Sequence, residues 1–136
     1  MKRSLIILAA GIAAIALAAP AGAGNNVSIN IRHQKVGCHA WAIGSGKYAA
    51  FHSLTVALGT TLTFKDNDVM PHTLTQLAGP AVTMRAPHMA KIGAQAAMTF
   101  TKPGSYVFGT KAGEDYMSGV KTIGPDNVLK LVVIVK

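Results

Sequence analysis

The chain has 136 residues, the length of one ordinary domain, and half of them are hydrophobic. Its 13 Lys and Arg side chains outnumber five Asp and Glu side chains, which leaves a formal net charge of +8. The basic residues are scattered singly with few aromatic residues between them, so no nucleic-acid interface is indicated. The few acids form no carboxylate pair for acid–base catalysis, and we predict that the protein is not an enzyme.

The N-terminal segment has the pattern of a secretory signal peptide. Two basic residues precede an uncharged apolar run, Leu5–Ala19, and small residues lead to a cleavage site after Ala23. The run is shorter than the roughly 20 residues that a membrane span needs, although an uncleaved anchor is the alternative. We predict a signal peptide over 1–23, one domain over 24–136, a periplasmic or secreted location and no stable membrane insertion.

Short runs of alternating apolar residues follow the signal segment, with turn signals between them. They lie at 26–32, 53–58, 61–64, 97–100, 105–108 and 127–136. Gly59 separates the second run from the third, and Pro103 with Gly104 suits a type II turn before the fifth. No segment has sustained helical periodicity. The pattern favours an all-β sandwich or barrel.

Three segments carry a resemblance to a known family. They are HSLTVALGTTLTFKDNDVMPHTLTQ (52–76), MTFTKPGSYVF (98–108) and NVLKLVVIV (127–135). In order and spacing they resemble the central hairpin, the penultimate hairpin and the closing strand of the cupredoxins, the blue-copper β-sandwiches. The resemblance implies a cupredoxin-like fold, an antiparallel or mixed Greek-key β-sandwich. It also implies that His72 is a copper ligand.

The resemblance breaks after Tyr106. In the family this strand leads to a cysteine, then a histidine, then an axial methionine, whereas the chain here reads SYVFGTKAGEDYMSGV. Thr110 stands at the place of the cysteine, no histidine follows, and Met117 alone has a counterpart in the family's loop. A conventional blue-copper site built on this loop is therefore excluded.

The strand directions implied by the resemblance indicate where other ligands lie. The first strand runs parallel to the strand before His72, so its exit loop reaches the same pole with the only cysteine, Cys38. A later segment returns to that pole with His88 and Met89. Copper electron-transfer sites use two imidazoles, a thiolate and a weak thioether. We predict one copper ion held by His72, Cys38, His88 and Met117, with Met89 as the alternative thioether, and we leave open whether His39 or His33 joins or replaces these ligands.

Each candidate also has a structural interpretation. His72 is otherwise a core histidine, and Cys38 is otherwise a small buried hydrophobe. His39 competes with Cys38, because neighbours in an extended chain point in opposite directions, and is otherwise exposed or beside the site. Trp41, at the end of the expected loop, is predicted to pack. The remaining histidines are expected at strand ends, on the surface or in the core: His33 and His52.

The resulting hypothesis is an exported, monomeric copper protein that passes single electrons to a transient redox or copper-exchange partner. A copper-sequestering or delivery protein is the first alternative, because cysteine, histidine and methionine together suit Cu(I). A metal-free β-sandwich that serves as an interaction module is the second. An intense visible thiolate-to-copper band that depends on Cys38 is the observation that separates the first hypothesis from the others.

Overall fold

The computed structural model describes residues 24–33, 39–112 and 128–136, in which the chain forms nine β-strands and no helix. The strands are β1 (Asn26–His33), β2 (His39–Ile43), β3 (Phe51–Val56), β4 (Thr61–Asp66), β5 (His72–Ala78), β6 (His88–Met89), β7 (Gln95–Thr99), β8 (Gly104–Ala112) and β9 (Val128–Val135). Within these ranges no helix is long and apolar enough to cross a membrane. The signal segment, Cys38 and Met117 lie outside the described residues.

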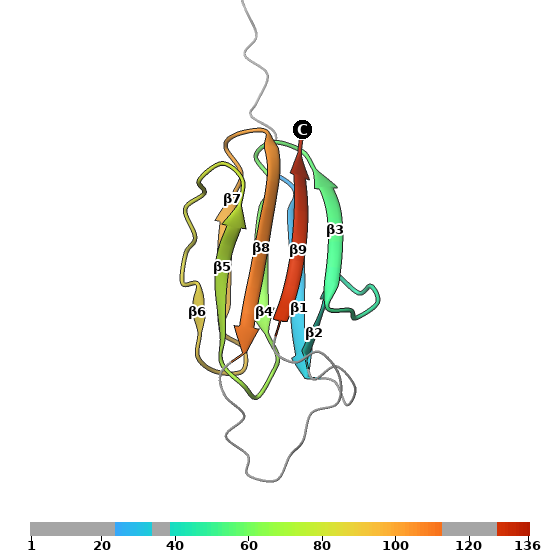
Figure 1. Ribbon diagram of the computed structural model, residues 1–136, viewed down its shortest axis with the longest axis vertical. Coiled ribbons are helices and arrows are strands. Elements are labelled where there is room, and N and C mark those ends of the chain that lie inside the picture. The colour runs from blue at the N-terminus through green and yellow to red at the C-terminus, as the bar shows by residue number, and fades with distance from the viewer. Residues whose placement is uncertain (1–23, 34–38, 113–127) are drawn as a thin grey trace, which may run out of the picture.

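The strands form two sheets that pack face to face (Figure 1). One sheet has the order β2-β1-β4-β7 and the other the order β3-β9-β8-β5-β6. The β1–β4 and β3–β9 pairs are parallel, and the remaining pairs are antiparallel. The predicted all-β sandwich with mixed sheets is therefore confirmed.

The core lies between the sheets because apolar side chains alternate along most strands. In β9 the predicted apolar face is buried, from Leu129 to Val135 in steps of two residues. The rings of Trp41 and Phe64 lie 5.8 Å apart between their centroids, and Phe64 lies 6.5 Å from Phe108 in the other sheet. These three aromatic rings therefore pack against one another across the interface between the two sheets.

The predicted loop over 33–41 is wrong at its C-terminal end. The chain reverses there and forms β2, which pairs antiparallel with β1 from His33↔His39 to Ile29↔Ile43. The first four residues of β2 are all buried, so the alternation that reveals a one-sided strand is missing. Trp41 is fully buried, as predicted.

The strand directions bring separate parts of the sequence to one end of the sandwich. Because β1 and β4 are parallel, both finish at the lower end in Figure 1, where β2 and β5 begin. The short strand β6 pairs with the first residues of β5 and so lies at the same end. We call this end the histidine pole. It is the end at which the sequence predicted the metal ligands.

Candidate metal centre

Three buried side chains are joined at the histidine pole. Asp68, in the loop between β4 and β5, places Oδ2 2.5 Å from His39 Nδ1 and 3.1 Å from His72 Nε2. All three side chains are inaccessible to solvent. His39 begins a strand of one sheet and His72 a strand of the other. One carboxylate oxygen therefore connects imidazoles from both layers of the sandwich.

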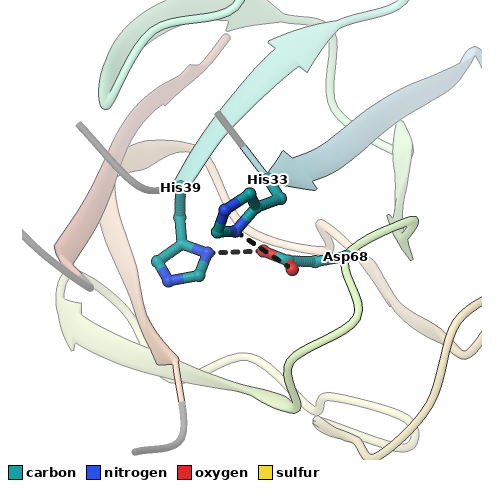
Figure 2. Close-up of side chains that lie close together, drawn as sticks. All are labelled: His33, His39 and Asp68. Atoms are coloured by element: carbon teal, nitrogen blue, oxygen red, sulfur yellow. Dashed lines mark hydrogen bonds and ion pairs between the residues drawn. The ribbon is translucent and has the colours of Figure 1, made fainter. Parts of the chain in front are cut away.

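His33 completes the group from the end of β1. Its Nδ1 lies 3.8 Å from Asp68 Oδ1, too far for a hydrogen bond. The side chain is 39% exposed, yet Nδ1 itself is buried and has no hydrogen-bond partner. Figure 2 shows the rings of His33 and His39 directed toward the carboxylate of Asp68. One donor atom from each of these three residues lies within 4.8 Å of the other two.

The loop before β5 is shaped by its own carboxylates. Asp66 Oδ1 accepts a hydrogen bond of 2.8 Å from the N–H of Asp68, and Asp68 Oδ1 accepts one of 3.1 Å from the N–H of Met70. Such side-chain to backbone bonds two residues apart stabilise turns without a regular strand or helix. They leave Asp68 Oδ2 directed at the imidazoles.

Thr110 of β8 holds His72 from the other side of the ring. Its Oγ1 lies 3.2 Å from His72 Nδ1. If Nε2–H donates to the carboxylate of Asp68, the Thr110 hydroxyl donates to Nδ1, and both ring nitrogens are satisfied. Thr110 thus contacts His72 from the position at which the cupredoxin pattern has a cysteine.

The two carboxyl groups of this loop have opposite electrostatic environments. Burial raises the pKa of Asp68, but hydrogen bonds from His39, His72 and the N–H of Met70 outweigh it and hold that pKa below the ordinary value. Burial raises the pKa of Asp66 above its ordinary value, and its Oδ2 has no hydrogen-bond partner. The environment of Asp68 therefore favours its charged form, and burial disfavours the charged form of Asp66.

Of the ligands predicted from the sequence, His72 lies in this group and His88 does not. The cross-strand pairs are His72 with Met89 and Thr73 with His88, so His88 lies on the opposite face of the sheet from His72. His88 is exposed, and its Nδ1 lies 2.9 Å from Thr73 Oγ1. Met89 is fully buried on the face of His72. Copper ligation by His88 stays a prediction.

One further member of the group, His39, lies at the pole that the sequence analysis predicts for it, and of the alternatives left open there it is buried beside the site and not exposed. Asp68 has no role in the sequence analysis, although its place between the fourth strand and His72 is a signal in the sequence. Cys38 and Met117 lie outside the described residues, and their ligation stays a prediction.

The donor set fits a transition-metal ion. Imidazole nitrogen and carboxylate oxygen are ligands of zinc and copper. Donors about 2.0–2.1 Å from one ion lie about 3 Å from each other in a tetrahedral site. The distances from Asp68 Oδ2 to His39 and His72 are 2.5 and 3.1 Å, so small side-chain movements suffice to admit an ion.

Comparisons with known proteins found similarity only at the level of structure. No family model and no curated protein matches the chain. A purple cupredoxin from Nitrosopumilus maritimus is 22% identical to this chain, with a TM-score of 0.45. The match covers 80% of this chain and 98% of the purple cupredoxin. A Cu(I) form of a methionine-to-alanine amicyanin mutant is 20% identical with a TM-score of 0.43, covering 83% and 82%. These matches concern the fold alone.

Proposed function

We propose that the protein is an exported copper-binding protein that carries single electrons, with its copper at the histidine pole. The observation that supports this proposal is the group of His33, His39, Asp68 and His72, of which the last three are fully buried and the two buried histidines come from different sheets. Burial of polar side chains costs free energy of folding, so a buried set of side chains that are suitable copper ligands indicates a function. The group is also the place where the cupredoxin resemblance puts the first copper ligand.

The surroundings suit electron transfer. The ligands stand on strand ends or on a turn held by its own hydrogen bonds, so a change of copper oxidation state requires little rearrangement. Of the four side chains in the group, His33 alone is exposed and offers a partner protein an approach to the centre. A small, transient interface with a redox partner is expected for such a carrier.

The test is a copper titration of the mature chain, followed by absorption and electron paramagnetic resonance spectra and by reversible redox cycling. We expect one copper ion per chain, lost in His72→Leu and retained in His52→Gln, the matched change at a histidine bonded to the backbone oxygen of Trp41. Loss of copper in His88→Gln would identify His88 as a ligand. A Cys38→Ala variant measures whether the thiolate contributes. Absence of stoichiometric copper binding would overturn the proposal.

Met89 favours one second candidate, copper sequestration or delivery. Its buried thioether shares the inner sheet face with His72, and thioether sulfur prefers Cu(I). Retention of Cu(I) under air, with no reversible redox wave, would favour this function over electron transfer. Fast reversible cycling would reject it.

A further inference from the structure

We infer that the histidine pole binds a divalent cation through nitrogen and oxygen donors. The ligands are His33, His39 and Asp68, whose donor atoms lie within 4.8 Å of one another, together with His72, whose Nε2 lies 3.1 Å from Asp68 Oδ2. The inference rests on the proposed function for the location of the metal, and it names a different ligand set from the one that the sequence predicted. It concerns only residues that the structure describes.

The distribution of carboxylates is the first argument. Asp66 and Asp68 are the only acidic residues in the described ranges, although the same ranges contain nine Lys and Arg residues. Both carboxylates are fully buried at this pole. Every ion pair among the described residues joins Asp68 to a histidine and none involves Lys or Arg. Hydrogen bonds and a nearby cation both stabilise a buried anion, and a divalent ion at Asp68 would add the cation that no Lys or Arg in the described ranges supplies.

Unsatisfied buried atoms are the second argument. His33 Nδ1 and Asp66 Oδ2 are buried without a hydrogen-bond partner, and both residues belong to this pole. Buried polar atoms are nearly always satisfied, so each exception calls for a missing partner. A cation next to Asp68 supplies that partner for His33 Nδ1, which already lies 3.8 Å from Asp68 Oδ1. The cation also offsets part of the free-energy cost of burying the carboxyl group of Asp66.

The orientation of the imidazole rings is the third argument. The planes of His33 and His39 are inclined by 76° with centroids 5.5 Å apart, and those of His39 and His72 by 83° with centroids 5.0 Å apart. Imidazoles bind a metal through a nitrogen at the ring edge, in the ring plane. Edge-on neighbours around one carboxylate can therefore direct nitrogen atoms at a common point, as stacked rings cannot.

The donor types determine which ions are expected. Three imidazoles and a carboxylate suit both Cu(II) and Zn(II), and Cu(II) binds more tightly to a given set of such ligands. The copper form should have the weak visible absorption of nitrogen and oxygen ligands, since no thiolate is bound. Of the four ligands, His33 is the one in contact with solvent, because its side chain is partly exposed.

The experiment is calorimetric titration of the mature chain with Cu(II) and with Zn(II), in the native form and in a Cys38→Ser, Met117→Leu double variant. We expect the double variant to bind one Cu(II) with a Kd within about threefold of the native value. His33→Gln should weaken binding tenfold or more, and the matched His52→Gln, at a histidine bonded to the backbone oxygen of Trp41 and outside the group, should not change it. The nitrogen hyperfine pattern of the copper spectrum should lose intensity in His33→Gln.

The outcomes separate this inference from the proposed function. If the double variant loses copper that the native chain binds, the metal uses sulfur, so the inference fails and the copper function stands. If His33→Gln binds as tightly as the native chain, His33 is not a ligand and the four-residue set is wrong. If the native chain binds neither ion, both proposals fail. His33 is the informative position because its half-exposed side chain makes no hydrogen bond in the core, so its substitution should leave the fold intact.

Discussion

Asp68 accepts hydrogen bonds from His39 and His72, and these bonds explain why a carboxylate is tolerated at full burial. In Asp68→Asn the side chain keeps its size but loses its charge, and its NH2 group replaces one acceptor. We expect the free energy of unfolding of the metal-free protein at neutral pH to fall by roughly 1–3 kcal/mol. Urea denaturation measures it, and an unchanged midpoint would show that the bonds contribute nothing to stability.

The two carboxyl groups of this loop predict opposite effects of pH on stability. The pKa of Asp68 is lowered on folding, so below the ordinary value of 3.8 the unfolded state binds more protons and stability falls with falling pH. The pKa of Asp66 is raised on folding, so the folded state binds more protons and stability rises as pH falls toward 3.8.

Urea unfolding of the metal-free chain between about pH 6 and pH 2.5 separates these effects. In the native chain the free energy of unfolding should fall as pH is lowered below the ordinary carboxyl pKa, and Asp68→Asn should lack this fall. Asp66→Asn should lack the increase in unfolding free energy that occurs as pH is lowered toward that pKa. Identical pH slopes in the native chain and in both variants would contradict the two environments described for the loop.

Thr110 offers a direct way to test the cupredoxin resemblance. Its hydroxyl oxygen lies 3.2 Å from His72 Nδ1, close to the separation of two ligands on one metal ion. In a Cys38→Ser background, Thr110→Cys places a thiolate beside His72 Nδ1, so Cu(II) should give an intense visible band if the metal binds at this nitrogen and none if it binds at Nε2 beside Asp68. Thr110→Ser in the same background keeps the hydroxyl and should show no such band. A colourless Thr110→Cys protein with bound copper would mean that this side of His72 cannot face the metal.

At the scale of strands, the sequence predicted most elements because their burial is one-sided. Val133 and Val135 of β9 alternate with exposed or partly exposed neighbours, and that alternation is visible in the sequence. In β2 the residues on both sides of Trp41 are buried, so no alternation remains. The sequence therefore predicts a loop here, and whether His39 is buried or exposed stays open in the sequence.

Trp41 and His39 lie on the same face of β2. The packing of Trp41 in the core therefore helps to fix the position of His39. Trp41→Ala should cost about 3–5 kcal/mol of unfolding free energy and should weaken copper binding. Trp41→Phe should cost less, because the indole Nε1 is buried without a partner and its loss removes that penalty. Phe51→Ala, at a residue that is 56% exposed, should change stability by about 0.5 kcal/mol or less. Equal effects of the three changes would contradict this account of the core.

Across the whole molecule, the parallel pairing of β1 with β4 is the feature that made the location of the site predictable. It implies that the end of β1 and the loop before His72 lie at one pole, and the structure confirms it. The identity of the neighbours was not predictable in the same way. Asp68 reaches the imidazoles through turn geometry set by Asp66, and a resemblance that supplies Cys, His and Met gives no reason to look for a carboxylate.

The charge of the whole molecule predicts how it exchanges electrons with small reagents. After the predicted cleavage, removal of Lys2 and Arg3 leaves 11 basic against five acidic side chains, a net charge of +6. In the described ranges both acids are buried and the basic residues are spread along the chain, so the accessible charge is strongly positive. The charge of the described residues therefore favours the approach of an anionic reagent to the half-exposed His33.

Stopped-flow oxidation of the Cu(I) protein provides the measurement. We expect an anionic iron complex to react at least tenfold faster than a cationic complex of similar potential at low salt. The difference should shrink as ionic strength approaches about 0.5 M, where the screening length is only a few ångströms. Rates that are equal and independent of salt would show that electrons enter far from the basic surface, and would count against the histidine pole as the site of exchange.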